Sequence, residues 1–290
     1  LDALLAGAGG LWCRLSPRRR QVAEENVRLA LGDDSPAARR SSIARASFRN
    51  LGTVAAELLL SRRLLGTRSA ASRFTYDGDW DLLDADLEAG RGALIVTGHL
   101  GNWEASNWAL RHRGIRLQAV VRTLDDPLLD GLVTDLRGGE GVVIRKWGAA
   151  RGILRAVRRG ACVGFLGDQN AGKHGVFVPF FGLDACTFPL PGSLHARFGV
   201  PLYAGCALRA GKGFRVPLKR LVAPGTLSPA EREKWALEAF HSVLEGWIKM
   251  YPRQYNWAHR RWRTRPLGET PGPEKPFYGR PWGQGAAWGP

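Results

Sequence analysis

Two kinds of hydrophobic pattern alternate along the chain, and together they predict its secondary structure. Continuous apolar runs with the length of buried strands occupy 93–97, 117–121, 141–144, 162–166, 175–180 and 201–208. Apolar residues at helical spacing begin near Asn102, Pro127, Ala149, Pro189 and Ser228. Because strands and helices alternate in this way, the sequence predicts an α/β fold with a mixed sheet flanked by helices.

The first 60 residues differ, since they show helical periodicity and no strand-like run. Ser35 is predicted to cap a helix that has Pro36 at its first position. The residues that recur at helical spacing there are Ile43, Ser47, Leu51, Val54 and Leu58. An N-terminal helical segment is therefore expected to run to about residue 60.

The last helix is predicted over 229–250, and we interpret its apolar stripe as core. The residues of that stripe are Trp235, Ala236, Ala239, Phe240, Val243, Leu244, Trp247 and Ile248. Residues 268–290 are rich in glycine and proline without a period, which predicts a flexible tail. No unit of roughly 20 to 50 residues repeats, so one domain is expected, with 1–60 as its helical segment and 61–267 as its α/β part.

The beginning of the chain is apolar and then basic. About a dozen mostly apolar residues precede Arg14, and Arg18, Arg19 and Arg20 follow. This order suits an interfacial helix, or the end of a membrane anchor with its basic flank on the cytoplasmic side, and a buried helix is the alternative. No run reaches the roughly 18 to 20 apolar residues of a spanning helix. Since the sequence begins without Met, a true N-terminus is expected to precede it.

The net charge indicates what kind of partner the protein binds, and the cysteines indicate the redox state of its compartment. The 42 Lys and Arg against 26 Asp and Glu give a formal charge of +16. This charge predicts an anionic partner: nucleic acid, acidic lipid, an acidic carrier protein or a phosphorylated substrate. Cys13, Cys162, Cys186 and Cys206 form no CxxC pair. We interpret them as reduced core residues, which fits a reducing, cytoplasm-facing location.

The stretch VTGHLGNWE, residues 96–104, carries the candidate chemistry. His99 follows an apolar strand, Gly98 and Gly101 allow a sharp turn, and Asn102 is a candidate helix cap. His99 would then lie at the carboxyl end of a strand and beside a helix N-terminus. Open α/β sheets bind ligands there, and such a helix end can stabilise a phosphate or a developing oxyanion. A histidine in this place is either structural or a general base that takes a proton from a hydroxyl.

A histidine base of this kind needs a carboxylate that fixes its tautomer. Glu104 follows His99 by five positions, which is about 140° around a continuous helix, so the helix must begin between the two residues. Asp168, in GFLGDQN, ends another buried strand and is expected at the same edge of the sheet. We favour Asp168 as the direct partner, with Glu104 bracing the turn or holding a basic residue.

Other chemistry has less support in the sequence. The motifs GxSxG, HExxH, GxxxxGK[ST] and GxGxxG are absent. His174 and His195 could join His99 in a metal site, but their spacing matches no common zinc motif. We therefore expect no metal and no bound cofactor.

Several stretches, in order along the chain, resemble the bacterial lipid A biosynthesis acyltransferase family, the late lauroyl and myristoyl transferases. The phosphatidylinositol mannoside acyltransferases are similar to that family. The stretches are GHLGNWE, VVRTLDDPLLD, GDQN, GVFVPFFGLDACTFPLPGSLHARFGVPLY and YNWAHRRWRTRP. The likeness covers roughly residues 1 to 266. It departs from the family at Asn170, where relatives often carry an acid.

The resemblance implies a glycerolipid-acyltransferase-like fold and an acyl transfer. The acyl chain would move from a thioester, on acyl carrier protein or coenzyme A, to a hydroxyl of a glycolipid such as a lipid A precursor. The place implied is the cytoplasmic face of the bacterial inner membrane, with the membrane surface as a partner and residues 1–60 as the membrane-associating segment.

The resemblance also implies roles for single residues. His99 and Glu104 match the HX4E motif of the family, and Asp168 matches an acid that contacts this histidine in some relatives. Arg122 matches an arginine associated with the polar headgroup or the donor phosphate. The residues expected to bind substrate are Gly101, Asn102, Arg122, Gln169 and Arg260.

Two other functions stay open. A thioesterase or hydrolase would use the same histidine with water in place of the alcohol. A non-catalytic basic protein would bind membranes or nucleic acid through residues 249–265, which carry aromatic residues, six Lys or Arg and no acid. No recognisable nucleic-acid module accompanies that segment, so no nucleic-acid partner is expected.

Overall fold

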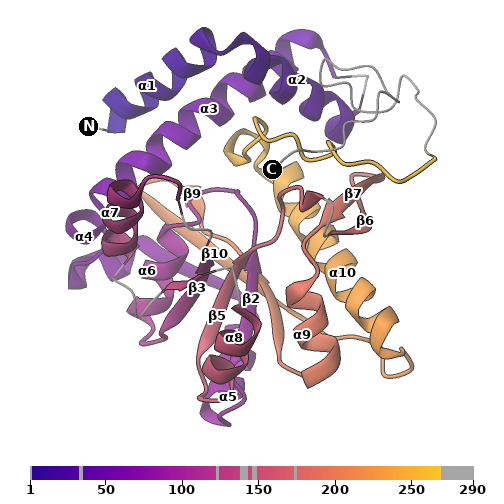
Figure 1. Ribbon diagram of the computed structural model, residues 1–290. Coiled ribbons are helices and arrows are strands. Elements are labelled where there is room, and N and C mark those ends of the chain that lie inside the picture. The colour runs from indigo at the N-terminus through magenta and orange to yellow at the C-terminus, as the bar shows by residue number, and fades with distance from the viewer. Residues whose placement is uncertain are drawn as a thin grey trace.

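The computed structural model describes residues 2–32, 35–121, 124–137, 143–145, 149–172 and 175–268. Figure 1 shows a central sheet with helices on both faces. The helices are α1 (Asp2–Leu15), α2 (Pro17–Leu31), α3 (Ala37–Leu59), α4 (Ser61–Leu64), α5 (Trp80–Glu88), α6 (Ala105–His112), α7 (Pro127–Arg137), α8 (Ala149–Val157), α9 (Leu190–Phe198) and α10 (Pro229–Met250), with the 3₁₀ helices η1 (Arg68–Arg73) and η4 (Pro252–Gln254). The strands are β1 (Phe74–Gly78), β2 (Ala93–Thr97), β3 (Leu117–Val121), β4 (Val143–Arg145), β5 (Cys162–Leu166), β6 (Val176–Phe180), β7 (Leu183–Thr187), β8 (Leu202–Gly205), β9 (Leu208–Ala210) and β10 (Gly213–Leu221).

Among the described residues, eight strands form one mixed sheet, which confirms the predicted fold class. Its order is β1-β10-β8-β2-β5-β3-β4, and β9 pairs with β10. Strands β8, β2, β5, β3 and β4 are parallel, whereas β10 is antiparallel to β8 and parallel to β1. Strands β6 and β7 form a separate antiparallel hairpin. The carboxyl ends of the central strands therefore meet at one edge, where ligands of open α/β sheets bind.

Side chains that alternate along the strands build a core on each face of the sheet. In β2, Leu94 and Val96 belong to the core that α8, α9 and α10 cover. Ala93 and Ile95 belong to the core that α5 and α6 cover. Because a central parallel strand is buried on both sides, the sequence of β2 is a continuous apolar run in which apolar and polar residues do not alternate.

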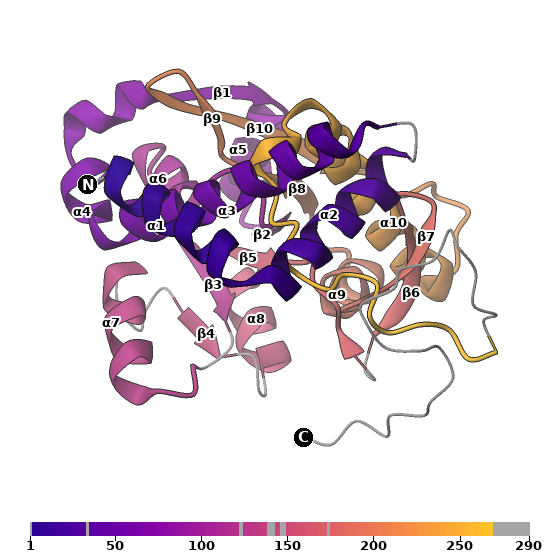
Figure 2. The same ribbon diagram turned by 90° about the horizontal axis from the view of Figure 1, so that it is seen from above.

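Helices α1, α2 and α3 lie across the carboxyl edge of the central strands (Figures 1 and 2). Gly9 permits the close crossing of α1 and α3, since a Cβ there would lie 2.2 Å from the carbonyl oxygen of Phe48. Trp12 packs edge-on against Phe48, with ring centroids 4.9 Å apart. Leu11 and Leu15 stay exposed, so α1 is only partly buried. Within the described part of the chain, no helix is both long and apolar enough to span a membrane.

Two predicted details are wrong. Helix α3 begins after Pro36 and receives no side-chain cap, and the buried hydroxyl of Ser35 has no hydrogen-bond partner among the described residues. The strand predicted over 201–208 is split into β8 and β9. It breaks at Cys206 because Pro217, which lies opposite in β10, has no N–H to donate to the ladder.

Strands β1, β7 and β10 were not predicted, because none of them is a continuous apolar run. Strand β10, GFRVPLKRL, mixes charged and apolar residues, and β1, FTYDG, buries only Phe74. Pairing with neighbouring strands holds both in the sheet, with β1 at its edge and β10 between β1 and β8.

Helix α10 is confirmed, and a capping box explains where it begins. The backbone N–H of Glu231 donates to the Ser228 hydroxyl at 3.4 Å, and the N–H of Ser228 donates to the Glu231 carboxylate at 2.8 Å. The predicted stripe packs on the sheet, with Phe240, Leu244 and Ile248 fully buried.

Phe240 is 1% exposed and Phe198 is 50% exposed. The same substitution at Phe198 is therefore a matched control for one at Phe240. We expect Phe240→Ala to lower the free energy of unfolding by about 3–5 kcal/mol, because it leaves a cavity between α10 and the sheet. Phe198→Ala should cost less than about 1 kcal/mol. Urea unfolding followed by circular dichroism measures both, and equal losses would contradict the assigned core.

Candidate active site

The register between β2 and β5 places His99 beside Asp168. Thr97 pairs with Leu166 at the ends of these strands. His99 lies two residues after Thr97, and Asp168 lies two residues after Leu166. The Nδ1 atom of His99 lies 2.7 Å from Oδ1 of Asp168, and the backbone N–H of His99 donates to Oδ2 at 2.8 Å. The structure therefore pairs His99 with the carboxylate that we favoured from the sequence.

This contact fixes the tautomer of His99. Because an ionised carboxylate can only accept, Nδ1 carries the hydrogen and Nε2 is left as an acceptor. The side-chain amide nitrogen of Gln169 lies 3.2 Å from Nε2 and donates to it. Trp103 packs on the imidazole, with ring centroids 4.8 Å apart. The His99 side chain is 14% exposed, so a substrate can reach the imidazole at its Nε2 end.

The ionisation of Asp168 is set by opposing effects. Burial alone would raise the pKa of this carboxyl, of which 2% is exposed. The charge of His99, two hydrogen bonds from His99 and the charge of Arg261 outweigh burial and hold the pKa at about 2. Asp168 is therefore ionised at neutral pH and can balance an imidazolium as it forms.

A cluster of buried polar side chains lies behind this carboxylate. Arg261, 2% exposed, donates to the Cys186 carbonyl at 2.6 Å and, from Nη2, to the Thr187 hydroxyl at 2.5 Å and to His241 Nε2 at 3.0 Å. His241 donates from Nδ1 to the Leu237 carbonyl at 2.7 Å. Burial first, and the charge of Arg261 second, lower the pKa of His241 to about 3. His241 is therefore neutral at neutral pH and can accept from Arg261.

Close backbone contacts explain the two glycines of the His99 loop. Gly101 has φ +67°, and a Cβ there would lie 2.1 Å from the carbonyl oxygen of Ala207. A Cβ on Gly98 would lie 2.9 Å from the methyl groups of Leu244 and 3.2 Å from Oδ2 of Asp168. A side chain at either position would displace the loop that carries His99.

The N-cap residue of α6 is Glu104, and the side chain of Asn102, the predicted cap, instead holds the turn just before the helix. The Oδ1 atom of Asn102 accepts from the N–H groups of Glu104 at 2.9 Å and Ala105 at 3.0 Å, and its Nδ2 donates to Glu57 at 2.6 Å. These two amides are therefore occupied and do not face a phosphate or an oxyanion. Asn102 is fully buried. Substrate contact by Gly101 and Asn102 stays a prediction.

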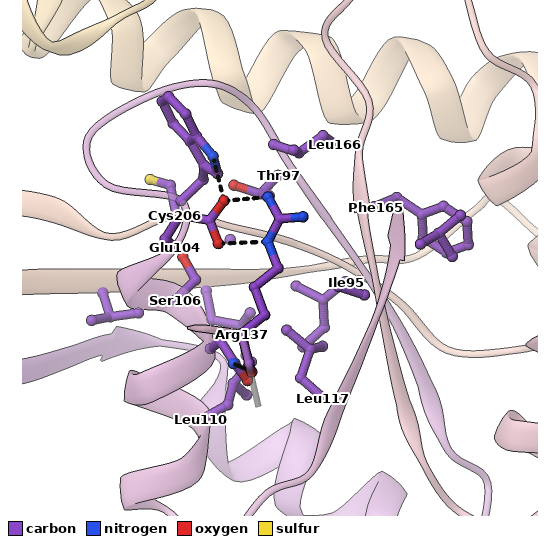
Figure 3. Close-up of a pocket in the computed structure, with 18 of the residues that line it drawn as sticks. Ile95, Thr97, Glu104, Ser106, Leu110, Leu117, Arg137, Phe165, Leu166 and Cys206 are labelled. Carbon is purple, nitrogen blue, oxygen red and sulfur yellow. Dashed lines mark hydrogen bonds and ion pairs between the residues drawn. The ribbon is translucent and has the colours of Figure 1, made fainter. Parts of the chain in front are cut away.

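Glu104 is turned toward Arg137 of α7 (Figure 3). Nε and Nη2 of Arg137 lie 3.0 and 2.6 Å from the two carboxylate oxygens, and Trp103 Nε1 donates to Glu104 at 3.2 Å. Although burial opposes it, this bonding raises the pKa of Arg137. Glu104 thus braces the turn by holding a basic residue. Sequence reasoning missed Arg137, because it is 33 positions away and only the fold brings it close.

An apolar pocket opens beside this ion pair, between the sheet and α6 (Figure 3). It measures about 810 Å³, counting the part open to solvent. Side chains from β2, β3 and α6 line it, among them Ile95, Leu117 and Leu110. Trp103 lines the same pocket and packs on His99, so the pocket lies next to the imidazole.

Segments from distant parts of the chain hold the His99 loop from behind. The N–H of Asn256 donates to the His99 carbonyl at 2.9 Å, and the N–H of Gly101 donates to the Gln254 carbonyl at 3.1 Å. Asn50, from α3, donates to the Gly101 carbonyl at 3.1 Å and to the Gln254 carbonyl at 2.9 Å. The position of His99 thus depends on α3 and on the segment that follows α10.

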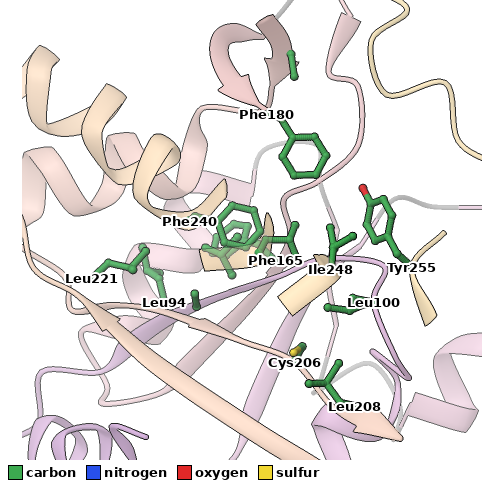
Figure 4. Packing of buried hydrophobic residues seen from close by; sticks show 14 of the residues in the cluster. Leu94, Leu100, Phe165, Phe180, Cys206, Leu208, Leu221, Phe240, Ile248 and Tyr255 are labelled. Atoms are coloured by element: carbon green, nitrogen blue, oxygen red, sulfur yellow. The ribbon is translucent and has the colours of Figure 1, made fainter. Parts of the chain in front are cut away.

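Apolar packing supports the same loop. Leu100 is fully buried and bridges to Tyr255, and Figure 4 shows it near Ile248 of α10. Ser47 donates to the Tyr255 carbonyl at 2.6 Å and ties this segment to α3.

His259 is a second residue that sequence reasoning missed. Its Nε2 accepts the backbone N–H of Asn170 at 3.0 Å, and burial, the largest influence, lowers its pKa to about 4. The neutral ring therefore fixes the turn that follows Asp168. The motif YNWAHRRWRTRP contains His259, but nothing in its spacing points to this contact.

The roles predicted for the other site residues stay predictions. Arg122, His174 and 269–290, most of the predicted tail, lie outside the described residues. Arg260 is half-buried beside Arg261, and its part in substrate binding stays a prediction. In the part of the chain that the structure describes, no three His, Cys, Asp or Glu residues gather as a metal site. The four cysteines are free and buried, as predicted.

Comparison with known proteins identifies the class of enzyme. A family model described as bacterial lipid A biosynthesis acyltransferase matches residues 1–264. The chain belongs to this family, and it is an O-acyltransferase.

Several relatives are similar over most of their length. The lipid A biosynthesis lauroyltransferase of Escherichia coli (strain K12) is 28% identical over 271 residues, which cover 90% of this chain and 85% of the relative. The lipid A biosynthesis palmitoleoyltransferase of the same organism is 26% identical over 261 residues, or 87% and 81% of the two chains. A lipid A biosynthesis acyltransferase of Haemophilus influenzae is 28% identical over 279 residues, or 91% and 85%.

The low pKa of His241 predicts a pH dependence of stability. Its folded-state pKa of about 3 lies below the ordinary value of 6.5, so the unfolded state binds more protons below pH 6.5 and stability falls as the pH drops toward 3. Each such histidine contributes a slope of about 1.4 kcal/mol per pH unit. Urea unfolding between pH 7 and pH 4 should give a shallower slope for His241→Gln. The same slope in both proteins would contradict the assignment.

Proposed function

We propose that this enzyme moves a fatty acyl chain from a thioester, on acyl carrier protein or coenzyme A, to a hydroxyl of a lipid A precursor, with His99 as the general base. The observation that carries the proposal is the His99–Asp168 pair at the edge of the sheet, beside an apolar pocket. The family and the relatives' names support transfer to lipid A.

The pair supports a simple sequence of steps. The acceptor hydroxyl displaces the Gln169 amide and donates its proton to Nε2 of His99 while its oxygen attacks the thioester carbonyl. Asp168 holds the ring by Nδ1 and balances the imidazolium. The tetrahedral intermediate then expels the thiolate, which takes the proton from Nε2. The base is neutral again, and the products are an ester and a free thiol.

The apolar pocket suits the acyl chain of the donor. Its walls are mainly aliphatic and aromatic, and Glu104 and Arg137 add a polar point near the imidazole. A fatty acyl chain bound in this pocket would have its thioester close to Trp103 and His99.

Positive charge suits the other groups of the substrates. The exposed residues Arg14, Arg18 and Arg19 accompany the exposed Leu11 and Leu15 on the N-terminal helices. This combination supports binding of residues 1–60 to an anionic membrane surface, at the cytoplasmic face of the inner membrane. We assign Arg122 and Arg260 to the phosphates of the acceptor or the donor.

Two variants test the proposed base. His99→Ala removes it, and Asp168→Asn removes the charge that fixes the tautomer, so each should lower transfer about 10²- to 10⁴-fold. Asp81→Asn, a matched change on the exposed side of α5, should keep full activity. Transfer of a labelled acyl chain to lipid A precursor measures all three. Near wild-type transfer by folded His99→Ala would rule out His99 as the base.

The same assay without lipid acceptor distinguishes acyl transfer from hydrolysis. A transferase should retain most of the label on the donor, whereas a thioesterase would release it as free fatty acid at an undiminished rate.

A larger residue in the pocket should change the preferred chain length. Ala119 lines the pocket, so Ala119→Phe should lower kcat/KM for long-chain donors about tenfold more than for short-chain donors. Ala89→Phe, on the exposed end of α5, should leave the ratio unchanged. Steady-state kinetics with donors of several lengths measure it, and an unchanged ratio in Ala119→Phe would place the acyl chain elsewhere.

A further inference from the structure

Helix α7 exposes three leucines and buries two of its polar side chains. Asp130 and Thr134 are 9% and 5% exposed, whereas Leu128, Leu129 and Leu132 are 86%, 51% and 49% exposed. A helix on the surface of a protein in water normally turns its apolar stripe toward the core. We call these three leucines the α7 patch.

The orientation of α7 is fixed by hydrogen bonds. The inward carboxylate of Asp130 accepts the backbone N–H of Leu124 at 2.8 Å. At the other end of the helix, Asn107 donates to the carbonyl of Arg137 at 3.0 Å, and the Arg137 side chain is bound to Glu104. Polar groups therefore hold the inner side of α7, and rotation of the leucines inward would break these bonds.

The position of α7 connects the patch to the candidate active site. Arg137, its last residue, lines the apolar pocket, and both ribbon views place α7 at the periphery of the molecule (Figures 1 and 2). An apolar medium in contact with the patch would therefore lie beside the proposed acyl-chain pocket.

We propose that the α7 patch inserts into the hydrocarbon of a lipid bilayer when the enzyme works on its substrate. This inference rests on the proposed function, because a lipid acceptor is what brings the enzyme to a bilayer. Burial of three leucines in hydrocarbon reverses the unfavourable exposure that they have in water.

Other occupants fit the patch less well. A stable dimer needs roughly 800 Å² from each partner, far more than three partly exposed leucines provide. An acidic carrier protein would meet the exposed carboxylates of Asp126 and Asp135 beside the patch. The same carboxylates weaken attraction to anionic headgroups, so apolar contact must carry the binding. This distinguishes the α7 patch from the arginine-rich N-terminal helices, whose binding would be sensitive to salt.

The test is a flotation assay of the full-length protein with vesicles of zwitterionic phosphatidylcholine at high salt, which suppresses binding through arginines. We expect Leu128→Ser combined with Leu132→Ser to lower the vesicle partition coefficient about tenfold or more. The matched control combines Leu82→Ser and Val222→Ser, two exposed apolar positions away from α7, and should bind as wild type does.

Two further measurements make the outcome decisive. His99→Ala should bind vesicles as wild type does, so a failure of the proposed chemistry would leave the membrane result standing. Unchanged partition of the α7 double variant, in a folded protein, would overturn the inference. So would a wild-type dimer that the double variant converts to a monomer in sedimentation equilibrium, since the patch would then face a second copy.

Discussion

The pairing of β2 with β5 is the constraint on which the site depends. Because Thr97 lies opposite Leu166, the loops after these strands bring the imidazole of His99 and the carboxylate of Asp168 to 2.7 Å. A slip of one residue would turn one of these side chains to the other face of the sheet. Helices cover both faces of these strands, so a slip would also bury a charge without its partner, which costs several kcal/mol. The same register thus serves stability and chemistry.

A second layer of polar groups makes the buried charges compatible with one another. Asp168 is ionised, Arg261 supplies a positive charge in the same interior, and the histidines at 241 and 259 are held neutral there. If either histidine took up a proton, the cluster would gain a positive charge close to Arg261. The low pKa values of both rings therefore keep further positive charge out of this part of the interior.

The sequence predicted the fold class and the central pair because both depend on local signals. Continuous apolar runs mark the buried strands that end before His99 and Asp168, and parallel strands must end at one edge of a sheet. Arg137 and His259 were not predicted, because their contacts depend on how α7 and the segment after α10 pack. At α7, helical spacing predicted the helix, but the polarity of its residues does not predict which side faces inward, because leucines are exposed and polar residues are buried there.

The hydrogen bonds between Gln254–Asn256 and the His99 loop determine when the site can form during synthesis of the polypeptide. The segment after α10 bonds to the His99 loop through its backbone, and it also carries His259 and Arg261, which lie behind Asp168. His99 and Asp168 leave the ribosome well before this segment. Helices α1, α2 and α3 are made first, yet Ser47 and Asn50 bond to that same late segment. The nascent chain therefore lacks an assembled site until synthesis has passed His259.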